Sequence, residues 1–515
     1  MMRDRNNAMR LTTTFAIVAL LLSAVALPMH AATITVTNTN DSGPGSLRQA
    51  LTNANNGDTI NFAVTGDIAL TGGGLEVAKN ITIAGPGADH LSIYASQQYE
   101  SQPTFHIVSG KTVTISGLTI SVGGILNDEA ILTLSNCVLS FNTIALFNNA
   151  ALNSGVIASV TIINSLFIDN VQGIYIESGP PLGSTRTLAR DGTLIRRPAD
   201  GGSGAGNCTA CVTIANSVVT DNTFGYRTST DLASTVTVLN SGFTGSSLEA
   251  ILSYGNAGIT VTNSTISGNL VGIETNFANV SIANSTISDN SGWRGGVFAA
   301  SGDLSIVNST ISGNSATTGT GGGIYGNGLD DLGIVNSTIS GNSANTGTGG
   351  GIYNYNSPLR ITNSTITGNS AGSGGGIYND GSGGASVVEI SNTILNAGAS
   401  GENIFNNGGT VTSDGYNLCS DDGGGYLTGP GDQINTDPLL GPLQNNGGLT
   451  FTHALLPGSP AVDAGDPNFV PPPSTDQRGC PFDRVFNGRI DIGSFETQPR
   501  GRPCPRPRLT PSPRP

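Results

Sequence analysis

A seven-residue phrase, Asn-Ser-Thr-Ile-Ser-Gly-Asn, constrains the fold of this chain more than any other feature. It begins at Asn263, and close copies begin at Asn284, Asn308, Asn336 and Asn363. The isoleucine of the phrase, followed into the related SNTIL, recurs at steps of 21, 24, 28, 27 and 28 residues, at Ile266, Ile287, Ile311, Ile339, Ile366 and Ile394. A constant phrase at variable spacing predicts strands that match from repeat to repeat, joined by turns of different length.

Each copy of the phrase lies between two other strand-like segments. An alternating run such as ITVTN (259–263) precedes it, and a Gly-rich segment such as GGGIY (321–325) follows it. Alternation of apolar and polar residues is typical of a strand with one buried face. One repeat is too small to bury its own apolar face, so the repeats must stack into parallel sheets. Because crossovers between parallel strands are right-handed, the sequence predicts an all-β fold, a right-handed parallel β-helix with three strands per coil.

The residues of the phrase have distinct expected roles in such a coil. We expect the isoleucines to point inward and to form one buried stack. We expect the asparagines at the turns, because Asn tolerates the left-handed backbone conformation that turns require. Their amides, about 4.8 Å apart from coil to coil, can form hydrogen-bonded ladders.

The N-terminal part of the chain contains the one convincing helix. SLRQALTNAN (46–55) predicts a short capping helix with Ser46 as its N-cap and Gln49 as the reciprocal partner in a capping box. Its apolar stripe, Leu47, Ala50, Leu51 and Ala54, should cover the N-terminal end of the coils.

Residues 1–31 have the pattern of a signal peptide, with arginines, a short apolar run and small residues. Cleavage after Ala31 or Ala32 is expected, and an uncleaved anchor is the alternative. The predicted organisation is a signal peptide (1–31), an N-terminal cap (32–58), a parallel β-helix (59–410) with a loop insertion at about 178–207, a C-terminal region (411–496) and a disordered Pro/Arg-rich tail (497–515).

The charge and the cysteines limit the partners and the cellular location that can be expected. The net charge is −14 and no basic stripe occurs, which argues against nucleic-acid binding. No second apolar run could cross a membrane, so we expect the mature chain to be secreted or held at the cell surface. We also expect it to be a monomer. Cys137 is expected to be a buried free thiol, while the pair Cys208 and Cys211 suits a local disulfide or two free thiols. Cys419 could pair with Cys480, although sequence alone cannot set connectivity.

Three segments resemble known families. SGPGSLRQALTNANNGDTINF (42–62) resembles the N-terminal region of CSLREA-domain proteins. Residues 434–465, with TDQRG (475–479) and DIGSFE (491–496), resemble the choice-of-anchor Q domain. The coils resemble the repeats of chlamydial polymorphic outer-membrane proteins, whose Phe-x-x-Asn pattern is matched by FIDN (167–170). The resemblance implies a secreted bacterial right-handed β-helix that is displayed at, or released from, the cell surface.

The clearest candidate for a binding surface is a column of aromatic residues. Each follows an inward-pointing residue of a GGGIY-type segment and should therefore point outward. The column comprises Phe298, Tyr325, Tyr353, Tyr378 and Phe405, on five successive coils spanning roughly 20 Å. Two interpretations stay open: a stacking ladder that steadies the sheet, or a platform for sugar rings or a partner protein.

The sequence contains weaker candidates for catalysis and metal binding. Asp169, Asp221 and Asp289 share one turn position, where Asp commonly replaces Gly or Asn. No catalytic residue, cofactor or metal site is therefore assigned. Calcium stays a possibility, because several C-terminal carboxylates could bind it without a recognised ligand spacing: Asp463, Asp466, Asp476 and Asp491.

The resulting functional expectation is a non-catalytic β-helix, adhesin-like or structural. Its partners would be extended extracellular polysaccharides or surface proteins. The alternative is a secreted polysaccharide lyase or glycoside hydrolase, which would need charged residues from adjacent coils converging on one groove.

Overall fold

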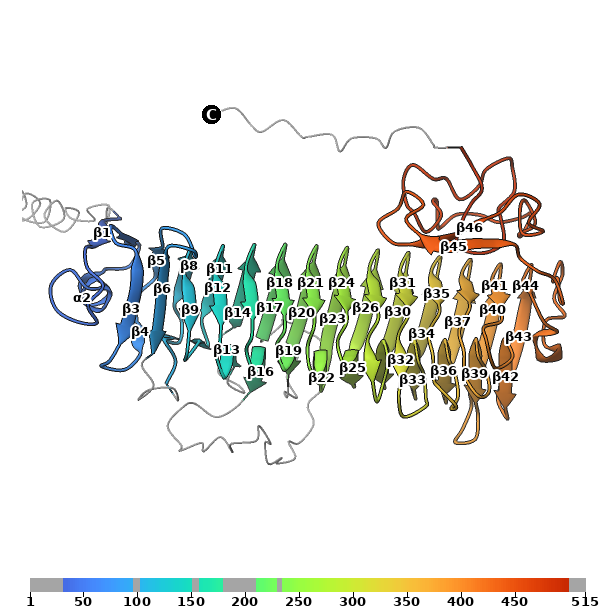
Figure 1. Ribbon diagram of the computed structural model, residues 1–515, viewed down its shortest axis with the longest axis horizontal. Helices are drawn as coiled ribbons and strands as arrows, with labels where there is room; N and C mark the ends of the chain where they lie inside the picture. The colour runs from blue at the N-terminus through green and yellow to red at the C-terminus, as the bar shows by residue number, and fades with distance from the viewer. Residues whose placement is uncertain (1–30, 96–101, 151–156, 179–209, 229–233, 500–515) are drawn as a thin grey trace, which may run out of the picture.

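The computed structural model describes residues 31–95, 102–150, 157–178, 210–228 and 234–499. The predicted loop insertion lies almost wholly outside these residues, as do the signal peptide before residue 31 and the tail from residue 500. The described chain is a right-handed parallel β-helix whose coils follow one another along a single long axis (Figure 1). This confirms the fold class predicted from the repeats.

Three long parallel sheets form the walls of the β-helix, and each complete coil gives one strand to each sheet. Sheet 1 has 15 strands, from β1 (Thr33–Val36) to β43 (Thr410–Gly415). Sheet 2 has 14 strands, from β3 (Gly66–Leu70) to β44 (Leu418–Cys419), and contains the repeated phrase in β24 (Thr265–Ser267), β27 (Thr286–Ser288), β31 (Thr310–Ser312), β35 (Thr338–Ser340) and β38 (Thr365–Thr367).

Sheet 3 has 13 strands and carries the aromatic column. Its strands are β4 (Leu75–Val77), β7 (Phe105–Ile107), β10 (Ile125–Asp128), β13 (Ile144–Ala150), β16 (Gln172–Ser178), β19 (Phe224–Thr228), β22 (Glu249–Tyr254), β25 (Val271–Asn276), β29 (Val297–Ala300), β33 (Ile324–Asn327), β36 (Ile352–Tyr355), β39 (Ile377–Asp380) and β42 (Ile404–Asn407).

The predicted isoleucine stack is present in sheet 2. Ile266, Ile287, Ile311, Ile339 and Ile366 pair in register, and all five are 0% exposed. The extension of the series to Ile394 is wrong, because Leu395 pairs with Ile366 whereas Ile394 pairs with Thr365. SNTIL has one residue fewer than the phrase between its turn asparagine, Asn392, and its isoleucine. Ile394 therefore points outward in β41 (Ile394–Asn396) and packs against the C-terminal region instead.

The two asparagines of the phrase have separate roles. The first has a left-handed backbone in every copy, with φ between 50° and 53°, as at Asn263 and Asn336. The second is buried, and its amide donates to the equivalent amide oxygen of the next coil. This ladder runs through Asn269, Asn290, Asn314, Asn342 and Asn369, with N···O distances of 2.8–2.9 Å. Turn geometry and amide pairing thus keep the phrase constant while loop lengths vary.

The capping helix is α2 (Leu47–Asn53), and it lies at the N-terminal end of the coils (Figure 1). Ser46 caps it by accepting a hydrogen bond from the Gln49 amide at 3.2 Å. The reciprocal half of the capping box is wrong, because the Gln49 side chain donates to Asn53 Oδ1, one helical turn further along. The buried residues Leu47, Ala50 and Leu51 seal the end of the core.

After β44 the chain folds back over the outer face of sheet 2 and forms a C-terminal lobe, residues 437–499. The lobe includes the hairpin β45 (Leu440–Gln444) and β46 (Thr452–Leu455), above the last coils in Figure 1. It covers the outward threonines of three phrase strands, Thr310, Thr338 and Thr365, which are at most 1% exposed. Gly493 touches the coils so closely that a Cβ would lie 2.9 Å from Thr365 Oγ1, so only glycine fits there.

The cysteines follow the predictions in part. Cys137 is a buried free thiol, as expected. The suggested pairing of Cys419 with Cys480 is wrong, because Cys419 is free and its Sγ donates to Asp421 Oδ1 at 3.0 Å. Cys480 and Cys211 are both disulfide-bonded. The second cysteine of the local pair suggested for Cys211, Cys208, lies outside the described residues.

Candidate functional site

Sheet 3 places the five aromatic residues of the predicted column side by side. Phe298, Tyr325, Tyr353, Tyr378 and Phe405 pair in register on consecutive strands. Neighbouring ring centroids are 4.8–5.3 Å apart. The first two contacts are edge-to-face and the last two are stacked, which are the favoured geometries for aromatic pairs.

The ladder is less open than an exposed platform would be. Phe298 is 3% exposed and Tyr353 is 9% exposed, whereas the other three rings are half-buried. The Arg294 guanidinium lies 3.2 Å from the centroid of the Phe298 ring and covers it. The Tyr353 hydroxyl donates to Asp380 Oδ2 at 2.6 Å, and burial together with this carboxylate raises the pKa of Tyr353. The surface available to a ligand along the ladder therefore consists of Tyr325, Tyr378 and Phe405.

On the coils that precede Phe298, the outward position of the aromatic column is occupied by three residues that are not aromatic, two of them charged. Glu274 pairs in register with Phe298, Leu252 with Glu274, and Arg227 with Leu252. Beyond Arg227 the position is aromatic again, at Tyr175 and Phe147, whose ring centroids are 5.4 Å apart. Two aromatic segments therefore flank a charged segment on one sheet face. We define the charged cluster as Arg227, Glu249, Glu274 and Arg294.

Aromatic groups frame the charged cluster and fix its geometry. Glu274 accepts a hydrogen bond from the Trp293 indole at 3.3 Å, and Arg294 Nη1 lies 3.9 Å from its other oxygen. The guanidinium of Arg227 lies over the ring of Phe224 at 4.9 Å. Both arginines are thereby held against aromatic faces, which orients their N–H groups.

Glu249 is the most unusual member of the charged cluster. It is 5% exposed, and within the described part of the chain its Oε2 accepts no hydrogen bond. Burial, and then the charge of Glu274, raise the pKa of Glu249, while Arg227 and Arg294 lower it less. A buried carboxylate oxygen without a donor is costly unless another group satisfies it. The Nε of Arg227 is likewise without an acceptor among the described residues.

Sequence reasoning did not find this cluster, because its members share no motif. They lie in RTST, SSLEA, IETN and GWRG, and only the strand register brings them together. One signal was available: the residue one coil before Phe298 at the same outward position is Glu274. A charged residue in a column of aromatic residues is a sequence-visible exception.

The three aspartates considered for catalysis occupy turns. Asp169, Asp221 and Asp289 have φ values of 56°, 53° and 55° and are exposed. The pairing of β15 (Leu166–Ile168) with β18 (Val218–Thr220) places Asp169 and Asp221 on adjacent coils. Gly268 and Gly313 have the same left-handed conformation at the same position, so the turn itself explains these residues.

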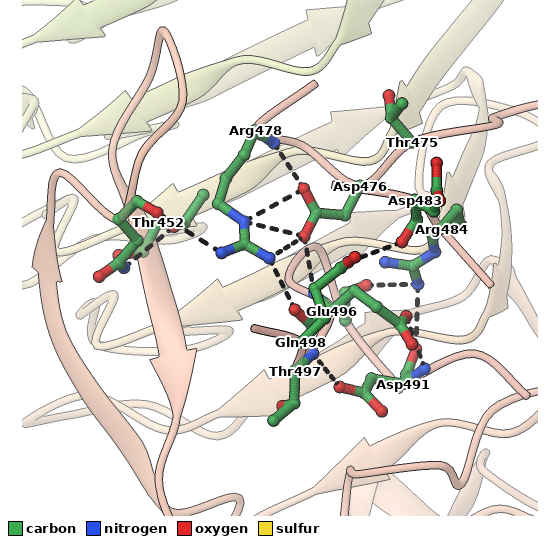
Figure 2. A network of polar contacts seen from close by, with 12 residues as sticks. Thr452, Thr475, Asp476, Arg478, Asp483, Arg484, Asp491, Glu496, Thr497 and Gln498 are labelled. Carbon is green, nitrogen blue, oxygen red and sulfur yellow. Dashed lines mark hydrogen bonds and ion pairs between the residues drawn. The ribbon is translucent and has the colours of Figure 1, made fainter. Parts of the chain in front are cut away.

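The C-terminal lobe contains a buried polar network (Figure 2). Asp476 and Arg478 form an ion pair at 2.6 Å, and the guanidinium lies 3.6 Å from the centroid of Phe482 and 3.8 Å from that of Phe495. Arg484 is 0% exposed and donates to the carbonyl oxygens of Asp491 and Gly493. These contacts join TDQRG to DIGSFE, so both motifs support the structure of the lobe.

Comparison with known proteins agrees with the fold. The family model described as a right-handed beta helix region matches residues 226–394. A search of curated protein sequences finds no match. Among solved structures, the mannuronan C-5 epimerase AlgE4 A-module of Azotobacter vinelandii is 13% identical, with a TM-score of 0.31, over 75% of this chain and 93% of that one.

Two further solved structures are similar at the same level. Pectate lyase Pel9A is 13% identical with a TM-score of 0.30, over 92% of this chain and 98% of that one. The catalytic domain of GH87 alpha-1,3-glucanase is 16% identical with a TM-score of 0.32, over 79% of this chain and 69% of that one. At these values the likeness concerns the β-helix fold alone.

Proposed function

We propose that this protein is a non-catalytic β-helix, secreted or displayed at the cell surface, that binds an extended glycan along the outer face of sheet 3. The observation that carries the proposal is Glu249, a nearly buried carboxylate with an unsatisfied oxygen, beside two guanidinium groups at one end of an aromatic ladder. A ligand hydroxyl would supply the missing donor.

The composition of the charged cluster suits a sugar. Its carboxylates accept hydrogen bonds and its guanidinium groups donate them, which matches hydroxyl groups that do both. The two positive and two negative charges balance, and the chain as a whole carries −14, so a strongly anionic polymer is disfavoured. The half-buried rings of Tyr325, Tyr378 and Phe405 continue the surface in a straight line from the cluster. A linear surface fits an extended, repetitive ligand.

Export is the second part of the proposal and rests on the pattern of residues 1–31. None of the helices in the described part of the chain has the length and apolar character needed to cross a bilayer. N-terminal sequencing of the exported protein should give a start near residue 32, and a mature chain that begins at Met1 would contradict this part.

Glycan cleavage is the second candidate function. It is favoured by the neighbouring carboxylates Glu249 and Glu274, because a pair of carboxyl groups, one of them with a raised pKa, is the arrangement that glycoside hydrolases use. In that case Glu249 would donate a proton to the leaving group.

One experiment separates binding from cleavage. A panel of neutral and acidic polysaccharides is tested with the wild-type protein for affinity, for new reducing ends and for unsaturated products. We expect saturable binding of a neutral glycan without bond cleavage. The double variant Glu249→Gln/Glu274→Gln should lose at least about tenfold in affinity.

Two comparisons make this result specific. Glu389→Gln is the matched control, because Glu389 lies on sheet 1 in an exposed ion pair with Arg360. The double change of Tyr325 and Tyr378 to Ser, which keeps the Tyr353–Asp380 hydrogen bond, should also weaken binding. Product release by the wild type that disappears in Glu249→Gln would replace the binding proposal by the enzyme, and unchanged affinity in both site variants would place the site elsewhere.

A further inference from the structure

We propose that Asp463, Asp491 and Glu496 form a binding site for a hard divalent cation, with Ca²⁺ as the favoured ion, inside the C-terminal lobe. One carboxylate oxygen from each residue lies within 4.8 Å of the others. Asp491 is 1% exposed and Glu496 is 0% exposed, while Asp463 lies at the solvent-facing edge of the group. Figure 2 shows Asp491 and Glu496 together within the polar network.

An unsatisfied atom gives independent support for a ligand at this point. Glu496 Oε2 accepts a hydrogen bond from the Asp491 amide at 3.0 Å. Its other oxygen, Oε1, is buried and accepts none within the described residues. A buried carboxylate oxygen in this state is stabilised either by a bound proton or by a cation.

The arginines nearby do not supply that group by direct contact. Arg478 is fully engaged with Asp476, and Arg484 directs its Nη2 to the carbonyl oxygens of Asp491 and Gly493. Among the ion pairs of the described residues, none joins Arg484 to Asp491 or Glu496. Three carboxylates therefore lie near one guanidinium that forms no ion pair with them, and when all three are ionised their charge exceeds that of the guanidinium by two. A divalent cation balances this excess.

The donor set selects the type of cation. All three groups offer oxygen, and neither His nor Cys belongs to the group, so a hard cation is preferred over zinc. Because Asp463 lies at the solvent-facing edge of the group, one side stays open for the water molecules that would complete the coordination of Ca²⁺.

The position of the site gives the cation a structural consequence. Asp463 belongs to the segment that follows β46, whereas Asp491 and Glu496 flank Gly493, which touches Thr365 and Ile394 of the coils. The Asp463 amide already donates to Asp491 Oδ1 at 2.6 Å, so the two segments are in contact. Bound Ca²⁺ would join the segments that dock the lobe on sheet 2.

Calorimetry on the full exported chain tests the site directly. Protein dialysed against EDTA is titrated with Ca²⁺ and, separately, with Mg²⁺, and its melting is recorded with and without each ion. We expect saturable binding of one Ca²⁺, weaker binding of Mg²⁺, and a higher Tm with Ca²⁺ because the ion binds the folded state.

The variant Asp463→Asn removes one of the three carboxylates that would bind the ion, without disturbing the fold. The Asp463 side chain accepts no hydrogen bond in the described chain, and Asn tolerates its φ of 51°. Affinity for Ca²⁺ should fall at least tenfold, with the metal-free Tm unchanged. Asp466→Asn, in the same segment, is the matched control, because Asp466 only caps the Asn468 amide. Absence of saturable Ca²⁺ binding, equal binding by Asp463→Asn, or tighter binding of Mg²⁺ would overturn the proposal.

Discussion

Glu249 is the single residue at which the proposed binding and the stability of the fold oppose each other. A residue placed only for stability at this position would resemble Val271, the buried residue with which Glu249 pairs on the next coil. Glu249 instead keeps a nearly buried carboxylate beside Glu274, with one oxygen unsatisfied. Binding sites commonly retain such unfavourable groups because a ligand satisfies them. The loss of stability caused by this carboxylate should therefore be measurable in the protein without ligand.

We predict that Glu249→Gln changes the pH dependence of stability. The pKa of Glu249 in the folded protein is raised above its ordinary value of 4.5, so the folded state binds more protons than the unfolded state as pH rises past that value. Stability then falls with rising pH. As the pH rises above about 4.5, the wild type should lose more Tm than Glu249→Gln in matched buffers. Parallel Tm profiles for the two proteins would contradict the buried, unsatisfied carboxylate.

At the scale of strands and coils, the sequence was informative wherever a residue repeats. The phrase predicts sheet 2 because each coil must place an isoleucine, a turn asparagine and an amide at matching points. The prediction failed at Ile394, which lies one residue closer to its turn asparagine than the isoleucines of the phrase do. Ile394 therefore faces outward, and Leu395 faces the core in its place. It also missed the charged cluster, because non-repeated residues are related only through strand register and the lengths of intervening turns.

The isoleucine stack allows a direct test of the strand packing. Ile311→Ala removes a side chain that is 0% exposed between Ile287 and Ile339. We expect a loss of about 2–5 kcal/mol in the free energy of unfolding, because the stacked coils above and below limit collapse of the cavity. Denaturant unfolding measures this loss of free energy. The control is Ser312→Ala, because Ser312 is the neighbour of Ile311 that faces outward. Equal midpoints for both variants would exclude the stack as the main source of stability.

At the scale of the whole molecule, the two outer faces have different roles. The C-terminal lobe covers sheet 2 over the last coils, whereas sheet 3 carries the charged cluster and the aromatic ladder. Sequence indicated a separate C-terminal region but not where it docks, because the outward threonines of the phrase strands look like ordinary solvent-facing residues. Their burial depends on contacts made by residues more than a hundred positions later in the chain, such as the bond between Thr338 and Gln477.

Gln477 is the residue that joins the lobe to the coils most directly. Gln477 is 2% exposed, and its side-chain oxygen accepts a hydrogen bond from Thr338 Oγ1 at 2.6 Å. Its side-chain nitrogen donates to Thr310 Oγ1 at 2.9 Å and to Oγ1 of the lobe residue Thr450 at 3.0 Å. One amide therefore bridges two coils and the hairpin region. Removing it would break hydrogen bonds to three buried threonine hydroxyl groups, at about 0.5–1.5 kcal/mol each.

We predict that Gln477→Ala undocks the lobe while the β-helix stays folded, because the isoleucine and asparagine stacks lie inside the coils and do not depend on the lobe. Hydrogen exchange should then be faster at residues 437–499 and at the outward-facing part of β35, with the amides of β24 and β27 still protected. Gln444→Ala is the control, since Gln444 is exposed on β45 and bonds only Asn446. If Gln477→Ala instead unfolds all coils in one transition, the lobe and the β-helix form a single cooperative unit.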